Sequence, residues 1–250
     1  MKILLLLSAI LLLSLFACGV ERAPEAKNKA QYIIDRSIEY HGGAAYRQMR
    51  VEYQFRKGTY SIANKDGAYT YTRSFEKEGQ TIKDILKNDG ELTRTIDGET
   101  VEVPDSMGRK YANSTNSVNY FTQLPYRLND SAVNKSYEGE TNIKGKKYEV
   151  LKVTFDEEGG GDDFDDTYYY WFDSENHSLD YLAYDFHVNG GGVRFRSAYN
   201  QRTIDGIRFQ DYINYKAPKN TELVKLPELL EAGKLEELSR IELRNIKFLN

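Results

Sequence analysis

Hydrophobic side chains recur at three- and four-residue spacing between residues 26 and 41, with polar residues in the intervening positions. The members of this stripe are Ala30, Ile33, Ile34, Ile38 and His41. Such spacing places one apolar face along a helix, so we predict an amphipathic helix over residues 26–41. Gly42 and Gly43 are expected to end it, because glycine adopts the left-handed conformation after a helix without strain.

From residue 50 onward the hydrophobic period changes to two. The alternating apolar positions are Val51, Tyr53 and Phe55, and then Tyr69, Tyr71 and Phe75. Alternation of this kind predicts strands with one buried face. Asp-Gly pairs at 66–67, 89–90 and 97–98 separate the segments and supply the positive φ of tight hairpins. The pattern therefore indicates an antiparallel meander without helical crossovers.

A second predicted helix interrupts the meander, and strands resume after it. That helix is predicted over residues 117–128, with Pro125 breaking its end. Strands are expected over residues 148–155, 167–172, 179–188, 193–199, 207–215 and 241–249, with helical turns over 227–232. The predicted fold class is α+β, a single curled antiparallel sheet of about ten strands, because open sheets this wide tend to curl. Such an unclosed barrel would wrap around two or three helices.

The N-terminus has the layout of a bacterial lipoprotein signal. Residues 3–16 are apolar apart from two serines, and this run is shorter than the roughly 20 residues that a membrane-spanning helix needs. Ala17 then precedes Cys18 as in a lipobox. We predict cleavage and lipidation at Cys18, which gives a signal peptide (1–17), a polar tether (18–29) and a folded domain (30–250). The alternative is an ordinary signal peptide with an incidental cysteine.

Composition narrows the function further. Cys18 is the only cysteine in the 250 residues, so an intramolecular disulfide and a thiol nucleophile in the fold are both excluded. With 34 Lys and Arg against 38 Asp and Glu, the formal charge of −4 argues against a nucleic-acid partner. The 20 tyrosines suit a broad sheet whose rings face a core and whose hydroxyls reach water. No cofactor is implied.

Several segments resemble a known superfamily. They are His41-Gly42-Gly43, the sequence FTQLPYRLND at 121–130, and residues 160–172 and 182–214. With the lipobox and the meander, they resemble the LolA/LolB-like periplasmic lipoprotein carriers, and within them an uncharacterised lipoprotein family of Bacteroidota. The resemblance implies an unclosed barrel with an apolar cavity for acyl chains, and it carries no catalytic residues. The expected location is the cell envelope, anchored on the outer membrane of a Gram-negative bacterium and facing the periplasm.

Two of the expected strands offer candidate ligand-binding residues. The first is the aromatic run 168–172, which is apolar on both faces and so predicts a strand covered on both sides. One of its faces, with Tyr170 and Phe172, could also line a ligand cavity. The second group is Arg194, Arg196, Asn200 and Arg202, which we expect on one strand face. Facing a cavity, they would bind a carboxylate or phosphate headgroup; facing outward, they form an ordinary charged surface, the favoured interpretation.

Two further motifs carry possible chemistry. Asp185 and His187 lie two apart on an expected strand, so the carboxylate could orient the imidazole as a general base. No nucleophile motif accompanies them, and a structural or surface pair is favoured. The glycine-aspartate stretch 159–166 could bind Ca²⁺ through carboxylates, but it matches no known calcium loop, and a solvated loop is favoured.

The leading hypothesis is a non-enzymatic lipoprotein that binds an acyl chain or another hydrophobic ligand in the concave face of the sheet. His187 is included among its candidate ligand contacts. The alternative is a structural or protein-interaction lipoprotein whose core is filled by its own side chains. An envelope hydrolase that uses Asp185 and His187 is the least favoured alternative.

Overall fold

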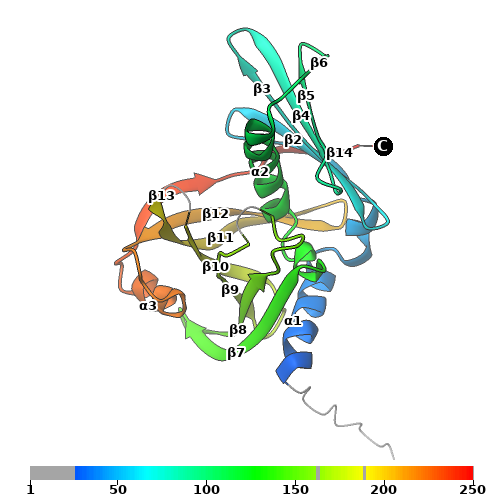
Figure 1. Cartoon of the computed structure of the whole chain (residues 1–250). Helices are drawn as coiled ribbons and strands as arrows, with labels where there is room; N and C mark the ends of the chain where they lie inside the picture. The colour runs from blue at the N-terminus through cyan, green and yellow to red at the C-terminus, as the bar shows by residue number, and fades with distance from the viewer. Residues whose placement is uncertain (1–25, 162–163, 188–189, 250) are drawn as a thin grey trace, which may run out of the picture.

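The computed structural model describes residues 26–161, 164–187 and 190–249, which form two seven-stranded antiparallel sheets and three α-helices (Figure 1). The predicted signal peptide and Cys18 lie outside these residues. The α+β class and the unclosed antiparallel architecture are confirmed. The sheet is divided in two, however, and not continuous as expected.

The N-terminal sheet has the strand order β14-β1-β2-β3-β4-β5-β6. Its strands are β1 (Arg50–Phe55), β2 (Gly58–Lys65), β3 (Ala68–Lys77), β4 (Gln80–Lys87), β5 (Leu92–Ile96), β6 (Glu99–Val101) and β14 (Arg244–Phe248). The predicted Asp-Gly turns join β2 to β3, β4 to β5 and β5 to β6. Asp66 and Gly67 have φ values of 48° and 92°, the positive angles that such a hairpin requires.

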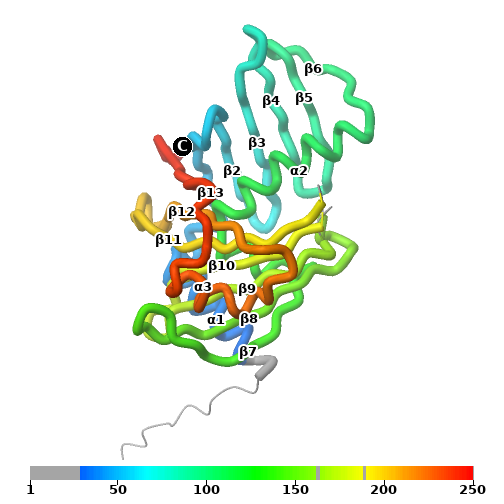
Figure 2. The backbone as a smooth tube through the Cα atoms, turned by 90° about the vertical axis from the view of Figure 1, so that its left-hand side faces the viewer, coloured from blue at the N-terminus to red at the C-terminus, as the bar shows by residue number. Residues whose placement is uncertain are grey.

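The C-terminal sheet has the order β13-β12-β11-β10-β9-β8-β7. Its strands are β7 (Val133–Ile143), β8 (Lys146–Phe155), β9 (Tyr168–Asp173), β10 (Leu179–Phe186), β11 (Gly192–Ile204), β12 (Ile207–Ala217) and β13 (Glu236–Ile241). The chain then passes through Glu242 and Leu243 into β14, the edge of the other sheet. The single strand expected over residues 241–249 is therefore wrong, because the Leu243 N–H bonds to the Asp211 carboxylate and leaves the ladder. Figure 2 shows the two sheets one above the other.

The predicted first helix is α1 (Ala26–His41), and the 3-10 helix η1 (Gly43–Gln48) follows it. The helix begins at Ala26 as predicted, so its first residues, 26–29, overlap the end of the range given to the tether. Ala30, Ile33 and Ile34 are at most 1% exposed and pack into one cluster with the C-terminal sheet. His41 is buried at the helix end, where its Nε2 accepts the Leu179 N–H at 3.2 Å. The apolar stripe thus fixes α1 to this sheet.

The second helix, α2 (Asp105–Thr122), begins well before residue 117, where it was expected. Its first turns are polar and exposed, so they carry no hydrophobic period that would reveal them. Pro125 separates it from the 3-10 helix η2 (Tyr126–Asn129). In Figure 1, α2 runs from the N-terminal sheet toward the C-terminal sheet, so it bridges the two.

The C-terminal sheet is covered on both faces, as the aromatic run predicts. Tyr170 and Phe172 pack in the cluster that contains α1. Trp171, on the opposite face, packs with Leu223 of η4 (Leu223–Lys225) and Leu226 of α3 (Leu226–Glu231). The face toward α1 and α2 is the one that contains the candidate site.

Candidate functional site

A partly open cavity of about 400 Å³ lies between α2 and the C-terminal sheet. Its apolar and aromatic lining residues are Phe55, Val118, Phe121, Leu124, Tyr168, Tyr184, Phe186, Tyr212, Ile241 and Leu243. Its polar and charged lining residues are Arg56, Ser117, Thr122, Asp166, Arg194, Arg196, Arg208, Gln210, Asn214 and Ser239. The site therefore combines an apolar wall with a strongly basic one.

Aromatic contacts form the apolar wall where α2 meets the sheet. Phe121 of α2 lies 6.3 Å from Tyr168 and 6.0 Å from Tyr184, measured between ring centroids. Tyr168 and Tyr184 stack at 5.2 Å across the neighbouring strands β9 and β10. These rings present a preformed apolar surface, which is the usual lining of a small-molecule site.

Hydrogen bonds hold α2 against the N-terminal sheet. Tyr53 Oη donates to Asn119 Oδ1 at 2.8 Å, and Gln123 Nε2 donates to Tyr71 Oη at 2.7 Å. Asn64 Nδ2 donates to Gln123 Oε1 at 2.8 Å. All five residues are buried, and burial raises the pKa of both tyrosines, so their hydroxyls stay neutral. A buried polar network of this kind fixes the position of α2 and thereby one wall of the cavity.

Arg196 is the most enclosed cation of the cavity, at 9% exposure. Its guanidinium lies 4.3 Å above the Phe121 ring, and one of its terminal nitrogens donates to Tyr184 Oη at 3.0 Å. Its Nε has no hydrogen-bond partner among the described residues. Stacking on aromatic rings keeps the planar fork rigid and leaves donors available to a ligand.

Next to Arg196, strand β12 contributes three polar positions of the cavity, Arg208, Gln210 and Asn214, and the ring of Tyr212 between them. Gln210 Nε2 donates to Tyr212 Oη at 2.6 Å and to the Leu179 carbonyl at 2.8 Å. Burial raises the pKa of Tyr212 to about 12, so its hydroxyl is neutral near pH 7. The sequence prediction did not include these residues. Their period-two spacing, read together with β11, is the signal that would have found them.

The four polar residues predicted on one face of β11 separate into two pairs. Arg194 and Arg196 line the cavity, whereas Asn200 and Arg202 do not. A bulge between Tyr199 and Arg202, with Asn200 at a φ of 50°, shifts the register there. One extra residue in a strand moves every later side chain to the opposite face of the sheet. Simple alternation along the sequence therefore placed all four residues on one face, which is wrong.

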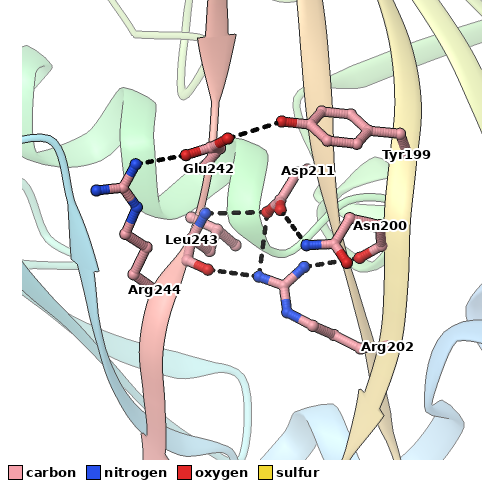
Figure 3. Close-up of polar contacts among 7 residues, drawn as sticks. All are labelled: Tyr199, Asn200, Arg202, Asp211, Glu242, Leu243 and Arg244. Atoms are coloured by element: carbon pink, nitrogen blue, oxygen red, sulfur yellow. Dashed lines mark hydrogen bonds and ion pairs between the residues drawn. The ribbon is translucent and has the colours of Figure 1, made fainter.

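Asn200 and Arg202 instead belong to a polar clamp, defined here as Asn200, Arg202, Asp211 and Leu243 (Figure 3). Asp211 accepts from Asn200 Nδ2 at 2.7 Å, from the Leu243 N–H at 3.0 Å and from Arg202 at 3.1 Å. Arg202 also donates to the Leu243 carbonyl. The clamp therefore holds the crossover between the sheets, and Leu243 of that crossover lines the cavity.

Tyr170 and Phe172, both predicted ligand contacts, are fully buried in the packed core and are not part of the cavity lining. Burial raises the pKa of Tyr170 well above its usual range. Alternation along the strand correctly predicted that the two side chains share one face of the sheet. At their position, however, α1 covers this face.

His187 lies outside the cavity, in a separate depression near the start of β11. Its Nδ1 is 3.6 Å from Asp165 Oδ2 and 3.5 Å from Asp166 Oδ1. Asp185 instead accepts the Thr167 N–H at 2.8 Å. Among the described residues, the expected Asp185–His187 pair is thus not formed.

The glycine-aspartate stretch is described only in part, since residues 162–163 lie outside the described ranges. The ligand atoms of Asp165, Asp166 and His187 lie within 4.8 Å of one another. Asp165 and His187 are exposed. One imidazole and two carboxylates form a donor set typical of a transition metal rather than of Ca²⁺, which prefers oxygen ligands alone.

A family model described as "Family of unknown function (DUF6503)" matches residues 3–243. No curated protein matches the sequence. Among solved structures, a LolA superfamily protein from Nitrosomonas europaea is 14% identical, with 88% of this chain and 94% of that chain covered and a TM-score of 0.50. This likeness shows that the two proteins share a fold.

Two further solved structures show weaker likeness. A domain described as an outer membrane lipoprotein-sorting protein from Vibrio parahaemolyticus is 9% identical, with coverage of 88% and 94% and a TM-score of 0.43. A DUF1329 family protein from Desulfovibrio piger is 12% identical, with coverage of 88% and 92% and a TM-score of 0.39.

Proposed function

The chain belongs to a family of unknown function, DUF6503, and has a LolA-like fold, and from this premise we propose that it binds an acyl chain or a similar hydrophobic ligand. The binding site is the cavity between α2 and the C-terminal sheet. The protein acts without catalysis, tethered to the cell envelope by lipid on Cys18. The cavity is the observation that carries this proposal.

Size and lining both support a ligand site. A volume of about 400 Å³ falls within the usual range of small-molecule pockets. Phe121, Tyr168 and Tyr184 supply apolar surface that would otherwise face water. The protein's own side chains leave this space between α2 and the sheet unfilled, which favours a ligand site over the structural alternative.

Attachment to a membrane is proposed through lipid rather than through a protein segment. No helix in the described part of the chain is long and apolar enough to cross a bilayer. Cys18 follows an apolar run and a small residue, the arrangement that a lipobox requires. Two or three acyl chains, at about 0.8 kcal/mol per buried methylene, hold a protein durably.

The absence of catalysis is part of the proposal and rests on the geometry near His187. Asp185 bonds to the Thr167 N–H, and His187 faces Asp165 and Asp166. A general base needs an orienting partner and a nucleophile within hydrogen-bond reach. The Asp185–His187 pair that the hydrolase alternative requires is therefore not formed among the described residues, which supports a role without catalysis.

Filling the cavity tests the proposal. Ser117 of α2 lines the cavity, while Ser114 lies three residues earlier on the same helix and is exposed. Ser117→Trp places an indole in the ligand space, and we expect it to weaken binding of a fluorescent fatty acid by about tenfold or more, or ~1.4 kcal/mol. Ser114→Trp is the matched control and should bind normally.

Lipid extracted from the purified protein and identified by mass spectrometry provides a second measurement. We expect the wild type to retain lipid and the Ser117→Trp variant to lose it. Wild-type protein with neither retained lipid nor saturable binding of the fluorescent fatty acid would contradict the proposed function.

A further inference from the structure

We infer that the ligand of this cavity is an anionic amphiphile, whose carboxylate or phosphate headgroup binds Arg196 with help from Arg194 and Arg208. This inference rests on the proposed function, since it specifies which hydrophobic ligand the cavity accepts. Three features of the site support it: its charge, its unpartnered buried polar atoms and the chemistry of its arginines.

The charge of the lining is strongly unbalanced. Arg56, Arg194, Arg196 and Arg208 are its cations, and Asp166 is its one acidic residue. Asp166 Oδ1 already lies 3.5 Å from His187 Nδ1, outside the cavity. Within the described ranges, no carboxylate oxygen lies within 4.0 Å of any of the four guanidinium groups. Among the described residues, the positive charge of the cavity therefore exceeds its negative charge, and the four guanidinium groups have no carboxylate at contact distance.

Elsewhere the fold gives its enclosed arginines a carboxylate. Arg94 makes two hydrogen bonds to Asp84, at 2.7 and 2.9 Å, and both side chains are at most 10% exposed. Arg202 contacts Asp211 at 3.1 Å in the clamp. Arg196 is as enclosed as Arg94, at 9% exposure, yet its partners among the described residues are only a tyrosine hydroxyl and two aromatic rings. Since burial of a charge is costly unless the charge is paired, a site that leaves Arg196 without a carboxylate favours an incoming anion.

Unpartnered polar atoms surround the same point. Arg196 and Asn214 are direct neighbours across β11 and β12, and neither Arg196 Nε nor Asn214 Oδ1 has a hydrogen-bond partner among the described residues. The same holds for Arg208 Nε and Gln210 Oε1. Asn214 and Gln210 are 8% and 7% exposed, so bulk water does not satisfy them fully. Buried polar atoms are normally bonded, so a cluster of exceptions within one cavity marks the position of a ligand. The two arginine Nε–H groups can donate to an anionic headgroup, whereas the two amide oxygens can accept only from a hydroxyl of the ligand or from water.

Arginine suits an acidic headgroup better than any other side chain. Its planar fork matches the two oxygens of a carboxylate or phosphate, and charge-assisted bonds of this kind are roughly twice as strong as neutral ones. Phe121 stacks against Arg196, and both Phe121 and Val118 of α2 line the cavity. They offer an apolar surface to the acyl chain of the ligand whose headgroup binds Arg196. A single ligand with an acidic head and an apolar tail satisfies both walls.

Photolabelling of the full-length lipidated protein in its membrane tests this inference. The probes are diazirine analogues of palmitate and of hexadecanol, which have matched chains and differ in headgroup charge. We expect the palmitate probe to label α2 and β12 about ten- to a hundredfold more efficiently, the ratio that one charge-assisted contact supplies. Arg196→Gln should reduce palmitate labelling to the hexadecanol level, Arg196→Lys should restore part of it, and Arg240→Gln on β13, exposed and outside the cavity, should change neither.

Equal labelling of the wild type by both probes, or an equal fall of both in Arg196→Gln, would overturn the inference while the proposed function stands. Labelling of the cavity by neither probe would contradict the proposed function itself. If Arg196→Gln melts at a lower temperature, Arg194→Gln replaces it, because Arg194 is only half-buried. A selective fall in its palmitate labelling is then the expected result, and no selective fall would overturn the inference.

Competition separates the two headgroup sources. The palmitate probe is competed with excess lysophosphatidate or with excess unlabelled palmitate. Stronger displacement by lysophosphatidate identifies a phosphate headgroup, and stronger displacement by palmitate identifies a carboxylate. Either order supports the inference. Failure of both to displace the probe would overturn it.

Discussion

The clamp around Asp211 provides a quantitative test of how the two sheets are joined. The substitution Asp211→Asn keeps the size of the side chain, but it removes the charge and turns one acceptor oxygen into a donor. Asp211 accepts three hydrogen bonds, from Asn200, Arg202 and the Leu243 N–H, and its side chain is 3% exposed. Each bond to a charged group contributes about 1.5–3 kcal/mol, and removal of one partner of a buried ion pair costs about 3–5 kcal/mol. We therefore expect the free energy of unfolding to fall by about 3 kcal/mol.

Urea unfolding measures this loss through Trp171, which is the only tryptophan of the chain and is fully buried. With a typical urea slope of about 1–3 kcal/mol per molar, the midpoint should fall by about one to three molar. The matched control is Asp205→Asn, because Asp205 is exposed in the β11–β12 turn at a φ of 48°, a conformation that asparagine tolerates. Its effect should stay within about 0.5 kcal/mol. Equal midpoints for the two variants would refute the view that the clamp holds the crossover.

Three further predictions concern other parts of the chain. Burial and, less strongly, Arg208 lower the pKa of His41 to about 3, so wild-type stability should fall as the pH drops from about 6.5 toward 3, by up to ~1.4 kcal/mol per pH unit. The urea midpoint of the His41→Gln variant should not show this fall at low pH. Midpoints of the wild type and the variant that change in parallel with pH would contradict the prediction. Asp84→Asn leaves Arg94 buried without its carboxylate and should cost about 3–5 kcal/mol in thermal or urea unfolding, whereas a loss below about 1 kcal/mol would contradict a structural role. Cys18→Ser should abolish incorporation of radiolabelled palmitate and move the protein out of the membrane fraction; unchanged fractionation would exclude the anchor.

Much of the fold could be predicted from local patterns in the sequence. The helix over 26–41, the Asp-Gly hairpins and the double burial of the aromatic run each depend on residues close together in the chain, and the structure confirms them. The LolA-like fold expected from the resemblance is likewise confirmed. The origin in Bacteroidota and the lipid on Cys18 stay predictions. Local periodicity succeeds where burial repeats regularly.

The features that the sequence did not predict depend on contacts between residues far apart in the chain. The division into two sheets occurs where Leu243 bonds to Asp211, a residue distant in the sequence, and no local pattern announces it. The first turns of α2 are polar and exposed and show no period. A single bulge near Asn200 separated Arg194 and Arg196 from Arg202. The same bulge explains why half of the predicted arginine face lines the cavity and half belongs to the clamp.

The pairing of β14 with β1 has a consequence for the order in which this protein can fold. Val51 pairs with Phe248 and Gln54 with Arg244, so the first strand of the chain receives one of its two neighbours from the last. Until β14 is available, β1 has only β2 beside it and remains the edge strand of the N-terminal sheet. Contacts of such long sequence separation form slowly, because the intervening loop must close first. We therefore expect the N-terminal sheet to be completed late in folding, after β14 has reached β1.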